Sequence, residues 1–380
     1  MPQQTSSIGT IKFLFQAGVQ SVLGEKAVAK ACQSQPIEVP TAILCIGKAA
    51  YSMYCGLSES IRQDVPALII TKEGHSPGTG SLPSHIRIIE STHPTPSGTS
   101  LIAGQTALDL VKGCGSSDRL LMLVSGGASS LAEVLSDGNT YDDLLRLTET
   151  SLSDGSNIST INARRKAISS IKAGRLLSCF KGCHVQVFAI SDVAGDDISI
   201  IGSGIGEYQS GDFDYSCRIV ASNSVARDAV ASAAQAQGLR VIANDENLYG
   251  DVEVIAEKIY AKCLSGTNGI YIFGGEPTIK LPPNPGKGGR NQSLALLLAK
   301  YFQGQPNIFC LVAGTDGTDG VTEAAGAIID GHSYTRLPGA DQYLAAADAG
   351  TYFKTTGDQL ITGPTGTNVM DLVIVLKYAS

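Results

Sequence analysis

The sequence lacks the patterns that identify several common classes of protein. Its nine cysteines include no C-x-x-C pair, and its five histidines show no metal-binding spacing. No apolar run approaches membrane-spanning length, and the first ten residues contain no basic segment followed by an apolar one. Scattered cysteines of odd number are typical of buried free thiols in a reducing compartment. We therefore expect a cytoplasmic protein that does not bind a membrane.

The chain also has few charged residues. They make up 17% of the 380 residues, against a hydrophobic fraction of 43%, and the net charge is −7. No basic block stands out, so electrostatic repulsion opposes a nucleic acid or an anionic membrane as partner. The composition predicts a compact protein whose partners are small molecules. It does not distinguish a monomer from a homodimer.

Short apolar runs that lead through small residues into helical periodicity recur along the first part of the chain. Runs of this kind are typical of parallel strands that are buried on both faces by helices. They predict a doubly wound, Rossmann-like α/β domain whose ligands bind beyond the carboxyl ends of the strands. The expected strands are 41–46, 67–71, 86–90, 120–124, 185–190 and 239–243.

A chain of this length exceeds what one hydrophobic core usually supports, so we expect two domains. Beyond a helix over 251–264 the strands lengthen and glycine becomes more frequent, with strands expected at 270–273, 325–330 and 369–376. We place the boundary between 1–245, the Rossmann-like domain, and 246–380, a second and smaller α/β domain.

The segment 286–290 carries two fixed cations in a loop almost without side chains, directly before a helix expected at 293–302. Gly286, Lys287, Gly288 and Gly289 allow backbone amides to approach an anion, and Arg290 offers a planar fork for phosphoryl oxygens. Lys287 is followed by glycine, so the loop is not a Walker A motif. We predict a phosphate site here; tight turns are the alternative.

A second glycine-rich loop, 313–320, carries Asp316 and Asp319. Carboxylates beside bound phosphates are typical ligands of Mg²⁺. We therefore predict that Asp316, Asp319 or Glu276 helps to bind Mg²⁺ on a nucleotide such as ATP.

Lys48 follows the first predicted strand and precedes a helix expected to run to about residue 61. Next to Gly47, it stands at the ligand edge of the sheet, where a cation gains nothing from the helix dipole and needs an anion. An exposed lysine that lies along its helix is the alternative.

Two further candidate binding loops follow predicted strands. Ser125, Gly126 and Gly127 offer amides and a hydroxyl that suit a carboxylate or a phosphate, although helix capping explains them equally well. Asp192 ends another strand, where it can accept a hydroxyl proton, bind a metal or close a turn. His93, in a Thr-His-Pro-Thr-Pro turn, stays an open candidate.

The densest basic stretch of the chain spans 162–175. On one continuous helix, Arg165 and Lys172 would share a face and Lys166 would point elsewhere. Part of this cluster is expected to be solvated surface, while one or two of its cations reach the ligand.

These motifs together resemble the class II glycerate kinases, whose C-terminal part is called the MOFRL domain. The resemblance covers nearly the whole chain and rests on ordered motifs: GKAA at 47–50, THPTP at 92–96, SGGAS at 125–129, INARRKAISSIKAGRL at 161–176, SDVAGDD at 191–197, GGEPT at 274–278, GKGGRNQ, AGTDGTDG and TGPTGTNVMDL. Two places depart from the family pattern, at Ala128 and at Ile205. These departures concern the identity of the substrate more than the type of reaction.

The resemblance implies ATP-dependent phosphorylation of D-glycerate, usually at the 2-hydroxyl, with the lysine at Lys48 and the arginine at Arg290 as the catalytic pair. In the expected in-line transfer, Asp192 orients the attacking hydroxyl in a cleft between the domains. Three alternatives stay open: a kinase for another small hydroxy acid, a nicotinamide-dependent hydroxypyruvate reductase, and a non-catalytic sensor. The reductase is disfavoured because no G-x-G-x-x-G follows a predicted strand.

Overall fold

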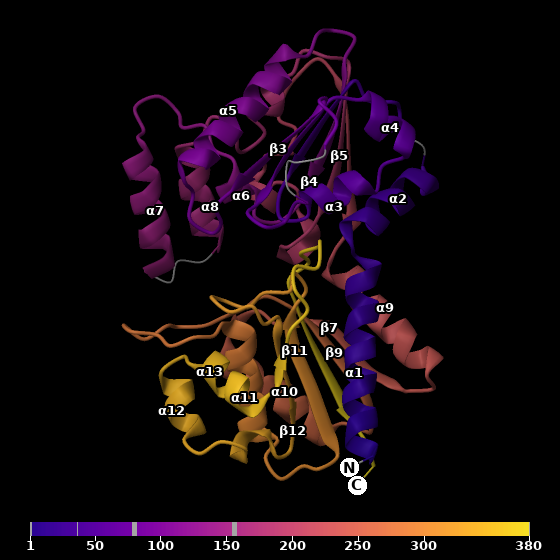
Figure 1. Cartoon of the computed structure of the whole chain (residues 1–380), viewed down its shortest axis with the longest axis vertical. Coiled ribbons are helices and arrows are strands. Elements are labelled where there is room, and N and C mark those ends of the chain that lie inside the picture. The colour runs from indigo at the N-terminus through magenta and orange to yellow at the C-terminus, as the bar shows by residue number, and fades with distance from the viewer. Residues whose placement is uncertain (1, 36, 78–81, 154–157, 380) are drawn as a thin grey trace. The chain divides into compact units, whose positions relative to one another are not determined.

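The computed structural model describes residues 2–35, 37–77, 82–153 and 158–379 (Figure 1). The chain divides into two compact units. The first unit comprises Leu23–Ser222 with Gly366–Asn368, and the smaller second unit comprises Met1–Val22, Asn223–Thr365 and Val369–Ser380.

The first unit contains a six-stranded sheet in which every neighbouring pair of strands is parallel. The strand order β3-β2-β1-β4-β5-β6 is that of a Rossmann fold. The strands are β1 (Ala42–Ile46), β2 (Ala67–Lys72), β3 (Ile86–Ser91), β4 (Arg119–Val124), β5 (His184–Ile190) and β6 (Asp214–Ala221). Five of them confirm the predicted strands. β6 was not predicted, because polar residues interrupt its apolar pattern at the edge of the sheet.

Helices cover both faces of this sheet. Alternate side chains such as Leu44 and Met122 pack against Ala103 and Ala107 of α5, while Ile43 and Cys45 point to the opposite face, where α3 contacts β1 and β2. The doubly wound fold is therefore confirmed. The helices are α2 (Gly24–Ser34), α3 (Ala50–Cys55), α4 (Glu59–Asp64), α5 (Gly98–Gly113), α6 (Ala128–Leu131), α7 (Tyr141–Ser153) and α8 (Ile158–Ala167), with 3₁₀ turns η1 (Leu177–Cys179), η2 (Ala194–Asp196) and η3 (Ile201–Ser203).

Two predicted helices are shorter than expected. The helix after Lys48 ends at Cys55, and a separate helix begins at Glu59, because Gly56 packs so tightly on α2 that a Cβ there would lie 2.3 Å from the carbonyl oxygen of Glu25. The basic stretch 162–175 is helical only to Ala167; beyond it, Ala173 has a φ of 53°. Arg165 and Lys172 therefore do not share one helix face, and that prediction was wrong.

The second unit contains a mixed six-stranded sheet of order β13-β12-β11-β14-β9-β7. Only β7 and β9 pair in parallel; the other neighbours are antiparallel. The strands are β7 (Val241–Glu246), β9 (Gly269–Gly275), β11 (Ile308–Gly314), β12 (Gly326–Asp330), β13 (Gln359–Leu360) and β14 (Asp371–Lys377), and β8 (Gly250–Asp251) pairs with β10 (Pro277–Thr278).

The helices of the second unit are α1 (Pro2–Ser21), α9 (Asn223–Ala236), α10 (Val252–Ser265), α11 (Arg290–Tyr301), α12 (Ala340–Ala345) and α13 (Ala349–Thr356), with the 3₁₀ turn η4 (Ser333–Thr335). The largest side chains of the core on one face, such as Tyr271, Phe273 and Phe302, pack with α10 and α11. In the part of the chain that the structure describes, no helix has the length and hydropathy that crossing a bilayer requires.

The division of the structure differs from the predicted boundary at 245/246. The strand expected within 239–243 pairs with β9, so it extends the second sheet. The N-terminal helix α1 also belongs to the second unit, because it packs on α9 and against β11 and β14. A Cβ at Gly18 would lie 2.7 Å from a methyl of Val230, so the missing side chain lets α1 and α9 approach closely. Local periodicity finds such elements but does not say which sheet they join.

Candidate functional site

The loops that follow β1 and β4 are locked together at the carboxyl edge of the first sheet. The amide of Lys48 donates to the carbonyl of Gly126 at 2.9 Å, and the amide of Ala49 donates to Oγ of Ser125 at 3.0 Å. Gly47 has a φ of 134°, and a Cβ there would lie 2.1 Å from that Oγ. Only glycine fits, and the backbone at Lys48 is held in place as a result.

Lys48 lies next to Gly127 and His93. Gly127 has a φ of 86°, and a Cβ at this position would lie 3.2 Å from both Cγ of Lys48 and Cδ2 of His93. The carbonyl of Lys48 also faces Nδ1 of His75 at 3.1 Å. Lys48 is half-buried at this point rather than lying fully exposed along a helix surface. The structure therefore brings His93, which the sequence left open, to the same place as Lys48.

Asp192, which follows β5, lies next to Gly126. Its Oδ2 accepts a hydrogen bond from Nδ2 of Asn368 at 3.1 Å. A Cβ at Gly126 would lie 2.0 Å from this carboxylate oxygen, so the glycine makes room for the pair. Asn368 was missed at the sequence level; only its place in the TGPTGTNVMDL motif pointed to it.

Ser125 differs from the substrate-binding role expected of it. Its amide donates to the carbonyl of Ile46 at 3.0 Å, its Oγ accepts from Ala49, and the residue is fully buried. Ser125 therefore shapes the interlocked turn. Of the three residues predicted to bind substrate, Gly126 and Gly127 lie beside Lys48.

The basic loop 286–289 belongs to the second unit and packs on two other segments. The amide of Gly286 donates to the carbonyl of Ala346 at 2.8 Å, and the amide of Lys287 donates to Oδ1 of Asp348 at 2.7 Å. A Cβ at Gly289 would lie 2.2 Å from Oδ1 of Asp319. The basic and acidic loops are thus in contact, as the sequence argument required.

Asp319 itself occupies the N-terminus of α11. Its carboxylate accepts the amides of Asn291 at 3.0 Å and Gln292 at 2.8 Å, and Nε2 of Gln292 at 3.0 Å. Burial raises the pKa of Asp319 to about 6, although these donors oppose the rise. Two amides at the N-terminus of α11 therefore bind the chain's own carboxylate. Asp319 acts here as a helix cap, which was not predicted from the sequence.

Arg290 is the first residue of α11 and joins two carboxylates. Its Nε donates to Oδ2 of Asp371 at 2.6 Å, and its Nη1 lies 2.7 Å from Oε1 of Glu276. Burial favours the neutral form, but the charges of Asp371 and Glu276 outweigh it and raise the pKa of Arg290 above its ordinary value. The guanidinium is therefore a fixed cation whose position is set by β9, β14 and α11 together.

The three carboxylates proposed for Mg²⁺ are engaged in other contacts. Asp319 caps α11, Glu276 pairs with Arg290, and Oδ1 of Asp316 accepts the amide of Thr318 at 3.0 Å. Across the described residues, no three carboxylate, imidazole or thiol side chains are grouped closely enough to bind a metal ion. The three residues therefore do not fit a protein-bound metal site.

The basic stretch contributes one buried and one half-buried cation to the first unit. Lys172 is fully buried and forms an ion pair with Glu133, which is also fully buried. Arg165 lies on α8, and its Nη1 contacts Oγ of Ser129 at 3.4 Å. That one or two of these cations reach the ligand stays a prediction, since Arg165 and Lys172 contact side chains of the protein itself.

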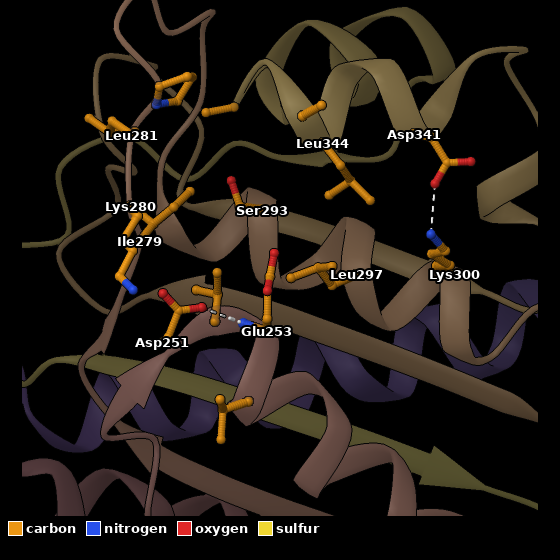
Figure 2. Close-up of a pocket in the computed structure, with 15 residues that line it drawn as sticks. Asp251, Glu253, Ile279, Lys280, Leu281, Ser293, Leu297, Lys300, Asp341 and Leu344 are labelled. Carbon is orange, nitrogen blue, oxygen red and sulfur yellow. Dashed lines mark hydrogen bonds and ion pairs between the residues drawn. The ribbon is translucent and has the colours of Figure 1, made fainter.

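The second unit also has a cavity of about 690 Å³ between α10, α11, α12 and the segment around Lys280 (Figure 2). Leu297 and Leu344 form apolar parts of its wall, and Lys300 and Asp341 form an ion pair of 2.7 Å at one side. None of the residues predicted to act in catalysis or binding lines this cavity.

The nine cysteines are all free thiols, as predicted. They were also predicted to be buried, but only four of them are: Cys45, Cys114, Cys263 and Cys310. Cys183 is exposed.

Comparison with known proteins also divides the chain into two parts, although the first part includes α9 and most of α1, which belong to the second unit of the structure. Residues 10–236 match the model of a domain of unknown function, DUF4147, and residues 269–371 match the MOFRL family. A D-glycerate 2-kinase of Thermotoga maritima is 31% identical over an alignment that covers 96% of each chain. A glycerate 2-kinase of Pyrococcus horikoshii is 30% identical over 88% of this chain and 86% of its own.

A protein of Agrobacterium vitis named putative hydroxypyruvate reductase is similar to the same degree, 32% identical over 88% of this chain and 98% of its own. The crystal structure of a glycerate kinase from Thermotoga maritima superimposes with a TM-score of 0.82 at 28% identity, covering 98% of this chain and all of that one. The chain therefore belongs to the two-domain DUF4147 and MOFRL family that includes the glycerate 2-kinases. The resemblance drawn from the motifs is confirmed.

Proposed function

We propose that this protein is an ATP-dependent kinase that phosphorylates D-glycerate at the 2-hydroxyl and releases 2-phosphoglycerate. The observation that carries the proposal is the arrangement of Lys48, Gly127 and Asp192 around Gly126. β1 and β4 are neighbours at the point where the strand order reverses. Ligands of such sheets bind in the crevice at this point.

The proposed chemistry needs little covalent participation by the protein. The 2-hydroxyl oxygen forms a bond to the γ-phosphorus as the bond to ADP breaks, and the hydroxyl proton passes to Asp192. Lys48 supplies positive charge where negative charge develops on the transferred group. The family resemblance implies Arg290 as the second cation. Its two carboxylate partners hold it in one orientation before any ligand binds, which supports a positioning function.

Mg²⁺ enters this proposal only as part of the MgATP substrate. Magnesium usually keeps several waters and binds through substrate phosphates. Because Asp316, Asp319 and Glu276 have other partners, we assign no step to a metal ion that the protein holds.

Regiochemistry follows from the way a short hydroxy acid is anchored. A fixed carboxylate places the hydroxyl on the adjacent carbon nearest to the anchor, whereas the terminal hydroxyl has one more rotatable bond. An assay coupled to enolase detects 2-phosphoglycerate directly, and the 3-isomer gives a signal only after a mutase is added. A signal that depends on the mutase contradicts the proposed regiochemistry.

The relatives named putative hydroxypyruvate reductase make reduction the second candidate. The fold does not separate the two, because nicotinamide enzymes use the same strand order. The loop after β1 favours the kinase, since it reads Gly47-Lys48-Ala49-Ala50 instead of G-x-G-x-x-G. Oxidation of NADH by hydroxypyruvate, measured at 340 nm against the kinase assay, decides between them. A cytoplasmic location stays part of the proposal, supported by the nine free thiols.

A further inference from the structure

Arg165 is a half-buried cation that forms no ion pair among the described residues. Its Nε is buried and has no hydrogen-bond acceptor, and its one polar contact among the described residues joins Nη1 to Oγ of Ser129 at 3.4 Å. Burial lowers the pKa of Arg165, and the charge of Glu133 opposes this. An unsatisfied charged donor is unfavourable in the protein alone, so the side chain is prepared for an acceptor that the described residues do not provide.

The carboxylate of Glu133, whose charge acts on Arg165, already has other partners. Glu133 accepts from Ser169 Oγ at 2.5 Å and from the amide of Val134 at 3.0 Å through one oxygen, and it pairs with Lys172 through the other. It therefore reaches Arg165 only as a distant charge and does not fill the guanidinium fork.

The position of Arg165 relates it to the candidate site. Ser129, its contact, lies two residues after Gly127, which packs against Lys48. Oγ of Ser129 also lies 2.8 Å from Oγ of Ser203. A guanidinium that contacts one hydroxyl, with a second hydroxyl next to the first, lies close to the 125–127 loop that packs on Lys48. This arrangement suits an anion that is planar and small.

We propose that Arg165 binds the carboxylate of the hydroxy acid substrate, in place of the Ser125 amide that the sequence argument had assigned. The inference deepens the proposed kinase function and rests on it for the identity of the substrate. A carboxylate matches the planar fork through two parallel hydrogen bonds, while Ser129 and Ser203 add hydroxyl partners. Arg165 then decides between acids and neutral polyols, because an unfilled buried guanidinium penalises any substrate without an anion.

The test compares Arg165→Ala, Arg165→Gln and the matched control Arg164→Ala, whose side chain is exposed. Loss of a charge-assisted pair is expected to raise KM for glycerate about 10- to 100-fold. KM for ATP stays within about twofold, and turnover of glyceramide, the neutral amide of the substrate, does not fall. Arg164→Ala behaves like the wild type. Far-ultraviolet circular dichroism and melting curves establish that each variant is folded. If Arg165→Ala does not fold, the comparison is made with Arg165→Gln.

An unchanged KM for glycerate, or a rise in KM for ATP instead, overturns the assignment; the second result makes Arg165 a phosphate ligand. Failure of the proposed function looks different, since the wild type then does not phosphorylate glycerate at all. In that event, calorimetric titration with D-glycerate and with D-lactate tests the carboxylate receptor directly. Binding to the wild type that disappears in Arg165→Ala supports it, and equal binding to both, or none to the wild type, refutes it.

Discussion

The buried ion pair between Lys172 and Glu133 offers the sharpest test of how the first unit is stabilised. Both side chains have no exposed surface. Burial lowers the pKa of Lys172, and the carboxylate of Glu133 opposes this. Replacing Lys172 by Met keeps the volume similar but leaves a buried carboxylate without its cation. Breaking a buried pair in this way costs about 3–5 kcal/mol.

In a unit of this size, that loss lowers the melting temperature by roughly 6–20 °C. Removing both charges is expected to cost much less. In the double variant Lys172→Met/Glu133→Gln, the remaining oxygen still accepts from Ser169 and Val134, as Oε1 of Glu133 does now. The double variant should therefore regain at least about 1.5 kcal/mol relative to Lys172→Met.

Urea unfolding followed by circular dichroism measures these differences. Arg146→Met is the matched control, because Arg146 pairs with Asp143 at 3.2 Å in the same unit while both side chains are exposed. It should change stability by less than about 1 kcal/mol. A Lys172→Met variant as stable as Arg146→Met, or a double variant no better than the single one, would refute the reasoning.

Three further predictions follow from the second unit and from Lys48. Lys48→Ala should lower kcat by several orders of magnitude and leave the melting curve unchanged. Arg290→Ala should lower both kcat and stability, because the buried carboxylate of Asp371 loses its partner. Arg290→Lys should not restore kcat, since a point charge does not replace the planar guanidinium fork. Steady-state kinetics and melting curves of the three variants test this prediction. A wild-type kcat in either alanine variant would contradict the catalytic role of that residue. Burial raises the pKa of Asp319 to about 6, so between about pH 4 and 6 the native state binds a proton that the unfolded state has released. The free energy of unfolding should therefore fall by up to about 3 kcal/mol as pH rises through this range. Urea unfolding across this range should show that fall in the wild type and not in Asp319→Asn, and parallel profiles would contradict it. Asp319→Asn should also leave the Mg²⁺ concentration for half-maximal activity unchanged, because the carboxylate caps α11; a clear rise in that concentration would restore Asp319 as a metal ligand.

The sequence by itself determined most strands of the first sheet and the family. Apolar runs followed by small residues located five strands of the first sheet, because a strand buried on both faces leaves a continuous hydrophobic signal. The same holds for β9 and β14, two interior strands of the second sheet. Glycine-rich loops with single charges, taken in order, identified the family before any coordinates. Lys48 and Gly126 were placed at the ligand edge by the rule that parallel strands end there.

Tertiary structure decided which charges meet. No local pattern shows that Asp319 caps the helix beginning at Arg290, that Asp371 holds the guanidinium, or that Lys172 is buried against Glu133, since these partners are separated by 28, 81 and 39 positions. The same limit explains why β7 was assigned to the wrong sheet. Periodicity reports the surroundings of one segment, whereas pairing between distant segments depends on the whole packing of the chain. A glycine-rich loop beside a cation therefore predicts an anion, and only the folded chain shows whether that anion is a ligand or its own carboxylate.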